Sequence, residues 1–436
     1  MVHFFGEHPF GKISEKIYFF QLIFLFCDIM RYYERIVEEK IESKLTDERI
    51  LDIVGPRECG KTTVAARFAN STISIDENYS SYEKLSEFKP ELLLEGEKPL
   101  LIDDIEKLPA LKGLIIRSSK RVHNNGLYIT TNSKSPKNPI KMYPMSLYES
   151  GDSLGDVKLM DLFKNPSMDI DGIESHLELE ELIEVTCRGG FPNALKNPDD
   201  IDSYVTRVIC NYMTDVDGSR KDHLKVAAIL RTYADNISSF KPNIDLLNLA
   251  RVDCPNLAKS TYYRYINGLK DLYVIDEVPS WNVKLKAASA VRKASKKAFC
   301  DPAIAISVLN LTPRDLLFDL EKFECIFKNL CLRDLRVYSQ IRDGKISYYA
   351  DRYGSEVDCI LEIDNGDYAL INFSLSSQRL ETSIKQLIAL RDLISSKVDA
   401  GKLTIRKPKF LAIITASSHA YTHKDGVKII PIGVLG

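Results

Sequence analysis

Residues 55–63 have types and spacing that could bind a phosphate chain: G-P-R-E-C-G-K-T-T. Glycines at both ends of such a loop let its backbone N–H groups wrap a phosphate, Lys61 can reach the β- and γ-phosphates, and the Thr62 hydroxyl can coordinate Mg²⁺. The alternative is a tight surface turn. We predict an ATP and Mg²⁺ site that contains Gly55, Pro56, Arg57, Glu58, Cys59, Gly60, Lys61, Thr62 and Thr63.

Two aspartates follow the apolar run 99–102. A phosphate loop needs an acid at the end of a neighbouring strand, so Asp103 is the candidate Mg²⁺ ligand and Asp104 the candidate to polarise the attacking water. Glutamate is usual at the second position, and the shorter Asp104 therefore predicts slow hydrolysis. A solvated acidic loop is the alternative.

A third apolar run, 126–131, ends in T-T-N-S. We predict that Asn132 contacts the γ-phosphate and the attacking water, and the alternative is a plain turn.

The elements that would position these residues alternate between strand and helix. An amphipathic helix at 31–45 and a strand at 49–54 precede the loop, and a helix at 61–70 follows it, with its N-terminus directed at the bound anion. Together with the runs 99–102 and 126–131, this order predicts a parallel α/β sheet, and we assign the phosphate-loop domain to 31–177.

Two further domains are predicted after the phosphate-loop domain. Residues 178–285 are mainly helical, and a capped helix at 260–272 followed by a strand at 272–278 predicts a helical lid with a winged helix. Residues 286–436 are predicted to form a second α/β domain. Its expected strands are 346–350, 357–363, 368–373 and 410–415, with a hairpin turn at Asn365-Gly366 and a helix at 381–396.

Composition limits the remaining choices. The chain has 436 residues, 44% hydrophobic and 28% charged, with a net charge of −2, which fits two or three globular domains without a global basic field. The nine cysteines are scattered without a C-x-x-C pair, as are the seven histidines, so we expect reduced thiols, no metal cage and a cytoplasmic location.

The apolar run 17–27 lies in a segment that we interpret separately. Eleven residues are too few to span a bilayer, and no A-x-A-like cleavage site follows. We predict that 1–30 is an upstream extension from a misassigned start codon. A buried helix is the next alternative and a membrane anchor is the least favoured one, so we expect no membrane partner.

Five stretches together resemble a known family: the phosphate loop, L-I-D-D-I-E at 101–106, P-M-S-L-Y-E-S-G at 144–151, C-R-G-G-F-P at 187–192 and D-R-Y-G-S-E-V-D at 351–358. From about residue 31 onward the chain is similar to prokaryotic AAA-type P-loop ATPases, which are related to the signal-transduction ATPases with numerous domains. The resemblance implies that Pro192 packs near the nucleotide base and that Arg188 reaches the phosphates. A helix C-cap followed by proline is the alternative.

One departure from the family concerns hydrolysis. Relatives carry a Gly-Arg pair before P-M-S-L, whereas 132–143 offers only Lys134, Lys137 and Lys141. Loss of an arginine that stabilises the transition state would remove a large catalytic term. The sequence therefore predicts binding more firmly than turnover.

A second departure concerns the last domain, which in the family resembles the PD-(D/E)xK nuclease fold. That chemistry needs several carboxylates and a lysine around Mg²⁺. Asp358 matches the strand aspartate, but Asn372 and Ser374 replace Glu and Lys, and Lys328 stands at the position of the helix acid. We predict an inactive module in which Asp358 and Asn372 face one cleft and Lys328 pairs with Asp358.

A short basic stretch follows the expected winged helix. Functionally it would contact the phosphates of DNA or RNA, and the alternative is a solvated charged face. Its members are Lys284, Lys286, Arg292, Lys293, Lys296 and Lys297.

The sequence as a whole predicts a nucleotide-dependent switch with slow hydrolysis and an unknown protein partner. A non-catalytic nucleotide-holding protein and a nucleic-acid-processing factor are the alternatives.

Overall fold

The computed structural model describes residues 32–436 apart from 122–123, 133–137, 214–220, 284 and 286–290. The predicted extension 1–30 therefore lies outside the described residues. The following description concerns Ile36–Gly436, which is one of the two units into which the chain divides.

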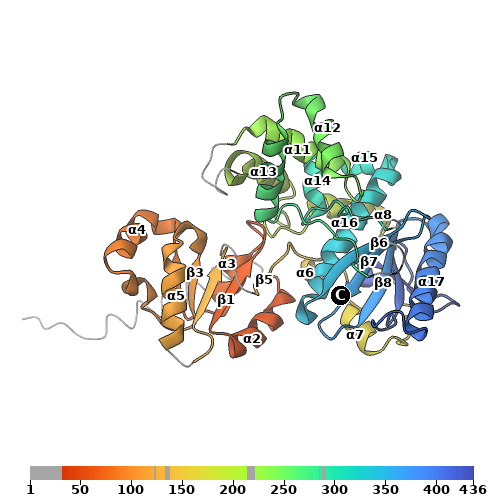
Figure 1. Cartoon of the computed structure of the whole chain (residues 1–436), viewed down its shortest axis with the longest axis horizontal. Helices are drawn as coiled ribbons and strands as arrows, with labels where there is room; N and C mark the ends of the chain where they lie inside the picture. Colours follow the sequence, from red (N-terminus) through yellow and green to blue (C-terminus); the bar gives the residue numbers. More distant parts are fainter. Residues whose placement is uncertain (1–31, 122–123, 133–137, 214–220, 284, 286–290) are drawn as a thin grey trace, which may run out of the picture. The chain divides into compact units, whose positions relative to one another are not determined.

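A five-stranded, wholly parallel sheet carries the phosphate loop (Figure 1). Its strand order is β2-β3-β4-β1-β5, so β4 lies between the strand before the loop and the strand that ends in the acids. The carboxyl ends of three adjacent strands thus meet at one edge of the sheet. The strands are β1 (Ile50–Val54), β2 (Ser71–Ser74), β3 (Leu100–Asp103), β4 (Tyr128–Thr131) and β5 (Ile140–Lys141).

Both faces of this sheet are covered, as a parallel sheet requires. Leu101 packs with Leu51 and Ile129 in one core, whereas Leu100 and Ile102 enter a separate core on the opposite face. The predicted elements are confirmed, although the first helix begins at Val37 rather than at residue 31. The helices are α2 (Val37–Asp47), α3 (Lys61–Arg67), α4 (Tyr79–Phe88) and α5 (Ala110–Arg121), with short 3-10 turns at Asp76–Asn78, Pro90–Leu94 and Ile105–Lys107.

After the edge strand β5 the chain leaves this sheet and forms α6 (Leu147–Ser150) and α7 (Leu159–Lys164). A helical region follows, as predicted. It comprises α8 (Leu179–Arg188), α9 (Asp200–Arg207), the π-helix η4 (Val208–Tyr212), α11 (His223–Asp235), α12 (Asn243–Asp253) and α13 (Lys259–Asp271).

The predictions around α13 are only partly confirmed. Its inward face is the expected one, with Tyr262, Ile266 and Leu269 buried, but the helix begins at Lys259 after Ala258, without a side-chain cap. The strand predicted at 272–278 is wrong, because only isolated antiparallel bridges form, between residues 275 and 299 and between 278 and 296. The winged helix remains a prediction.

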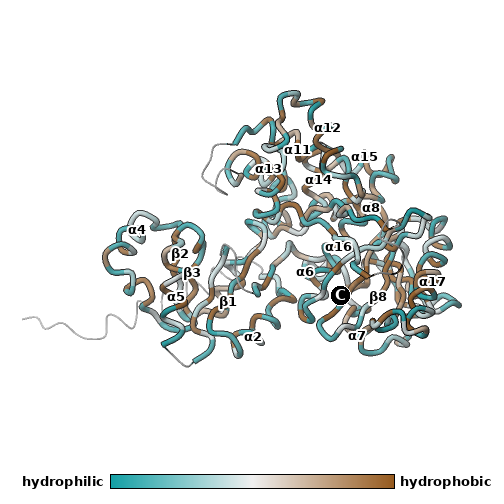
Figure 2. The backbone as a smooth tube through the Cα atoms, viewed as in Figure 1, coloured by the Kyte–Doolittle hydropathy of each residue, from teal (hydrophilic) through white to brown (hydrophobic). Residues whose placement is uncertain are grey.

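The C-terminal region contains a six-stranded mixed sheet in the order β10-β11-β9-β8-β7-β6. Helices cover both of its faces: Cys359 and Ile371 pack in the core that includes α16, whereas Ile360 and Leu370 pack in the core that includes α17. Hydrophobic stretches follow the strands of both sheets (Figure 2). The expected strands and the helix are confirmed.

The elements of this region are α14 (Pro302–Val308), α15 (Pro313–Phe318), α16 (Leu320–Tyr338), a 3-10 turn at Gln340–Arg342, β6 (Lys345–Ala350), β7 (Glu356–Glu362), β8 (Tyr368–Ser374), α17 (Ser377–Asp399), β9 (Leu411–Thr415), β10 (Tyr421–Thr422), β11 (Val427–Pro431) and a 3-10 turn at Ile432–Val434. The hairpin turn at 365–366 is confirmed, since the Ile363 N–H donates to the Asp367 carbonyl at 2.9 Å across it.

Within the described ranges, none of the helices has the length and apolar character needed to cross a bilayer. The eight cysteines that the structure describes are all free thiols.

Candidate functional site

The phosphate loop connects the end of β1 to the start of α3. Gly55 is required there, because a Cβ atom at this position would lie 2.2 Å from the Met142 carbonyl oxygen. The Met142 N–H in turn donates to the Val54 carbonyl at 2.7 Å, and Gly60 caps α3 in a left-handed conformation. The loop is therefore fixed between its own helix and the segment that leaves the sheet.

Lys61 lies inside this loop and is 5% exposed. Its ammonium donates to the carbonyl oxygens of Pro56 at 2.6 Å and Gly55 at 3.1 Å. Among the residues that the structure describes, no carboxylate lies within ion-pair distance of this ammonium. A buried cation that forms no direct ion pair favours an anionic ligand at the same place.

Three hydroxyl and carboxylate side chains meet beside Lys61. The Thr62 hydroxyl donates to the Asp103 carboxylate at 2.9 and 3.1 Å, and the Thr131 hydroxyl donates to it at 2.5 Å. Burial raises the pKa of Asp103, although both hydroxyl donors oppose that shift. Oxygen donors of this kind fit a hard cation such as Mg²⁺, which would also compensate the buried carboxylate.

Asp104 and Asn132 are also brought together. The Asn132 amide donates to the Asp104 carboxylate at 2.6 Å, and the Asp104 N–H donates to the Thr131 hydroxyl at 2.9 Å. Both residues have a left-handed backbone, with φ of 54°. Thr131 therefore connects the two acids, a role that the sequence analysis missed because it selected Asn132 from T-T-N-S.

The other loop residues occupy distinct environments. Cys59 is fully buried, whereas Thr63 is exposed. Arg57 forms an ion pair with Glu106 at 3.0 Å, and Glu58 contacts the helical region.

Arg188 has a partner in the structure. Its guanidinium pairs with the Asp152 carboxylate at 2.5 Å, so it would have to leave Asp152 to reach a phosphate. Pro192 is half-buried at the end of the same motif. A direct role of Arg188 and Pro192 in nucleotide binding remains a prediction.

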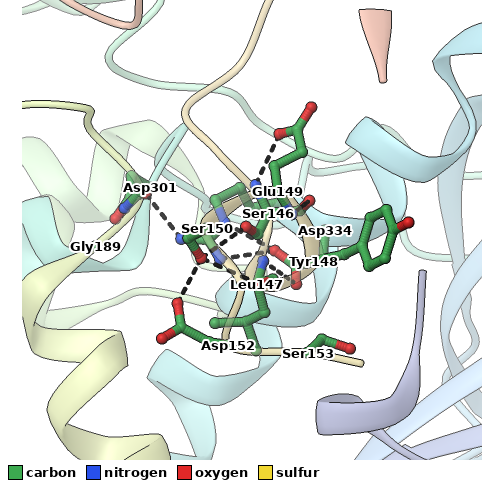
Figure 3. A network of polar contacts seen from close by, with 12 residues as sticks. Ser146, Leu147, Tyr148, Glu149, Ser150, Asp152, Ser153, Gly189, Asp301 and Asp334 are labelled. Carbon is green, nitrogen blue, oxygen red and sulfur yellow. Dashed lines mark hydrogen bonds and ion pairs between the residues drawn. The ribbon is translucent and has the colours of Figure 1, made fainter. Parts of the chain in front are cut away.

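The motif 144–151 builds a polar junction (Figure 3). Ser146 and Glu149 form a reciprocal capping box at the start of α6, and the Ser150 hydroxyl donates back to the Ser146 carbonyl at 3.0 Å. The Leu147 N–H donates to the Asp334 carboxylate at 3.1 Å. The start of α6 is thereby attached to α16.

A buried triad extends this junction to the motif 187–192. Arg333 pairs with Asp334 at 2.7 Å and with Asp301 at 3.0 Å, and Asp301 accepts from the Gly190 N–H at 2.9 Å. The Gly190 carbonyl accepts from the Met145 N–H at 2.7 Å. Two of the motifs that carry the family resemblance, 144–151 and 187–192, therefore meet at the C-terminal half of α16.

A second ion cluster joins the same helix to β5. Lys141 pairs with Asp276 at 2.8 Å, and Arg336 pairs with Asp276 at 3.2 Å. Burial acts to raise the pKa of Asp276, but the two cations outweigh burial and lower it. Of the three lysines in the segment where relatives carry a Gly-Arg pair, Lys141 is thus paired with Asp276, and Lys134 and Lys137 lie outside the described residues.

The C-terminal module shows the predicted pairing of Lys328 with Asp358. The Lys328 ammonium lies 3.1 Å from both oxygens of the buried Asp358 carboxylate, and the Lys296 ammonium lies 2.5 Å from one of them. The Asp358 N–H donates to the Asn372 side chain at 2.9 Å, which confirms that these residues are adjacent. Two lysines therefore surround one carboxylate, which leaves little attraction for Mg²⁺.

The predicted basic face at 284–297 requires correction. Lys296 and Lys297 are buried rather than exposed, since they pair with Asp358 and with Glu277 (2.8 Å) respectively. Arg292 and Lys293 are exposed, whereas Lys284 and Lys286 lie outside the described residues. Two of the six cations are therefore unavailable to nucleic acid.

The buried Asp358 should make the module sensitive to acid. Burial acts to raise its pKa, but Lys296 and Lys328 lower it well below the usual value. The resulting stability is present above the unfolded-state pKa of about 4 and is lost as the pH falls below it. We expect Asp358→Asn to be less stable at neutral pH, by about 3–5 kcal/mol, and to lose less stability on acidification.

Urea unfolding between pH 3 and 7 checks this prediction, with Asp399→Asn as the control for an exposed carboxylate that is paired with Lys407. An equal loss of stability on acidification in wild type and Asp358→Asn would contradict it.

Comparison with known proteins identifies three segments. Residues 47–150 match an AAA domain, 179–315 a domain of unknown function (DUF8612) and 324–435 another domain of unknown function (DUF4143). Residues 47–150 are therefore a P-loop domain of AAA type. The nuclease-like character of the last segment remains a prediction.

Two individual proteins are similar over long stretches. The uncharacterized protein MJ1544 of Methanocaldococcus jannaschii is 22% identical over 423 residues, which cover 92% of each chain. The Walker-type ATPase paby2304 of Pyrococcus abyssi matches 64% of this chain and 97% of its own, with 13% identity and a TM-score of 0.39.

Proposed function

We propose that the chain binds ATP with Mg²⁺ at residues 55–63 and acts as a nucleotide-dependent switch. The observation that carries this proposal is the contact of the Thr62 hydroxyl with the Asp103 carboxylate, beside the buried ammonium of Lys61, which donates to the carbonyls of Gly55 and Pro56. Thr62 and Asp103 would hold Mg²⁺, which neutralises phosphate charge when bound. The AAA-domain match over 47–150 supports nucleotide binding.

Different side chains of the site would bind the phosphates and orient the attacking water. The Lys61 ammonium would exchange its carbonyl acceptors for phosphate oxygens, and the loop N–H groups would surround the phosphate chain. Asp104 and Asn132 would orient the attacking water. Turnover should be slow for two reasons. The Asp104 side chain is one methylene shorter than the usual glutamate, and Lys141, one of the lysines in the segment where relatives carry an arginine, is paired with Asp276.

Asp104→Glu tests this account of turnover. We expect the longer side chain to leave ATP affinity unchanged and to raise hydrolysis, whereas Asn132→Ala should lower hydrolysis further because it frees the carboxylate at position 104. Steady-state phosphate release measures both effects. A wild-type rate at the ordinary enzymatic value of about 10 per second would refute the prediction of slow turnover.

The proposed switch uses the segment 140–150 as its connection. At one end, the Met142 N–H of this segment donates to the Val54 carbonyl at the end of β1. The segment also contacts α16, through the ion cluster of Lys141, Asp276 and Arg336 and through the Leu147 N–H. The same helix presents Lys328 to Asp358 in the C-terminal module. A displacement of the loop on nucleotide binding would therefore be transmitted to the module along α16.

A non-catalytic nucleotide-holding protein is the remaining alternative, and phosphate release compared with Lys61→Ala separates it from a slow ATPase. The two lysines on Asp358 oppose nuclease activity. We propose action in the cytoplasm on an unidentified protein partner.

A further inference from the structure

The phosphate loop contains a carboxylate of its own. Glu58 has a φ of 64°, and its side chain is 21% exposed. Negative charge at this point of the loop would repel the phosphates of a bound nucleotide. The surroundings of Glu58 therefore decide how well the loop can accept an anion.

Arg207, the last residue of α9, neutralises Glu58 through a two-pronged contact. Its Nε and Nη2 atoms donate to the two carboxylate oxygens at 2.7 and 2.6 Å. The Tyr212 hydroxyl in η4 also donates to Glu58. The hydrogen bond with Glu58 is the main cause that raises the pKa of Arg207, so the guanidinium stays charged.

The contact is accessible enough to exchange partners. The Arg207 side chain is 31% exposed, and a second acid, Asp200, lies 3.5 Å from its Nη2. Arg207 directly precedes the π-helix η4, an irregular helix type that is often found at functional sites. Arg207 is therefore a cation of the helical region that lies at the phosphate loop and is not deeply buried.

We propose that Arg207 is a phosphate-binding residue whose guanidinium moves from Glu58 to the phosphates when ATP binds. This inference rests on the proposed nucleotide site. A guanidinium binds carboxylates and phosphates with the same planar fork, and a triphosphate brings more negative charge to the loop than one glutamate. The transfer would supply positive charge to the phosphates, couple α9 to the nucleotide and favour ATP over ADP.

A static clamp between the loop and α9 is the competing explanation, and the two differ in the sign of one effect. In a clamp, Arg207 and Glu58 act together, so loss of either weakens nucleotide binding. In the transfer, Glu58 competes with the phosphates for Arg207, so loss of the Glu58 charge strengthens ATP binding.

Calorimetric titration of the full chain with ATP and with ADP, each with Mg²⁺, tests the transfer. We expect Arg207→Ala to weaken ATP binding about 10- to 100-fold, the value of one charge-assisted contact, with a smaller effect on ADP. Arg207→Lys should fall between, since it keeps the charge but loses the fork. Glu58→Gln should bind ATP more tightly than wild type.

A remote pair provides the matched control. Arg342 contacts Asp364 through the same two-pronged geometry, at 2.7–3.0 Å, with comparable exposure. Arg342→Ala and Asp364→Asn should leave both affinities unchanged.

The outcomes separate this inference from the proposed function. If wild type does not bind ATP, or binds it equally after Lys61→Ala, both fail. If Lys61 is required for binding but Arg207→Ala has the ATP affinity of wild type, only the transfer is overturned. The same holds if Glu58→Gln and Arg207→Ala both weaken the binding of ATP and of ADP to the same extent. Melting temperatures of every variant show whether a loss of binding reflects unfolding.

Discussion

Replacing Lys61 by alanine is expected to weaken ATP binding by about 100-fold or more, because the ammonium would make more than one charge-assisted contact with the phosphates. The residue is positioned for this role, since the loop carbonyls of Gly55 and Pro56 hold its ammonium inside the loop. Calorimetric titration with ATP and Mg²⁺ measures the loss directly.

The control for this experiment is Lys428→Ala in the C-terminal module. Lys428 is also buried, and its ammonium also donates to a backbone carbonyl, that of Met168, at 2.6 Å. We expect Lys428→Ala to bind ATP as wild type does. Equal affinity in Lys61→Ala and wild type would mean that the nucleotide binds elsewhere.

The second large effect should come from Arg333, whose side chain is 1% exposed between Asp301 and Asp334. Arg333→Ala leaves two buried carboxylates without their cation, which should cost about 3–5 kcal/mol of unfolding free energy. The Leu147 and Gly190 N–H groups depend on the same carboxylates, so the junction around α6 should loosen.

Urea unfolding measures this loss, and Arg342→Ala provides the control, because its half-exposed pair with Asp364 should contribute only about 0–1 kcal/mol. Equal unfolding midpoints for the two variants would show that the triad does not hold the junction together.

The chemistry of the loop was predictable because it depends on spacing along the chain. The pattern of residues 55–62 fixes which groups would surround a bound phosphate, and the strand that ends at Asp103 places an acid at the same sheet edge. The pairing of Lys328 with Asp358 was also predictable, because the family resemblance assigns both positions to one site.

Pairings between distant residues that no family pattern links could not be predicted. Glu58 meets Arg207 across 149 positions, and Lys296 meets Asp358 across 62. Lys296 looked like part of a solvated basic stretch, because a charged residue carries no local signal of its burial. Thr131 was missed for a related reason, since its function depends on β4 lying between β1 and β3.

The strand expected at 272–278 does not form, because tertiary structure overrides the local pattern. The apolar residues of this segment do not alternate in burial, since the neighbours Val274 and Ile275 are both buried, and Tyr273 has a φ of 59°, which interrupts an extended chain. The alternation in sequence therefore does not become an alternation of burial, and it is a case in which period-two patterning does not imply a strand.

Hydrogen exchange of the full chain with and without ATP and Mg²⁺ tests the central claim most directly, because it reports both where the nucleotide binds and how far the effect travels. We predict slower exchange at residues 50–67 and 100–104, together with a change in 140–150 and in α16, and no such effect in Lys61→Ala. Protection confined to other segments, or the same protection in Lys61→Ala, would contradict the nucleotide site, and protection limited to the loop would contradict the switch.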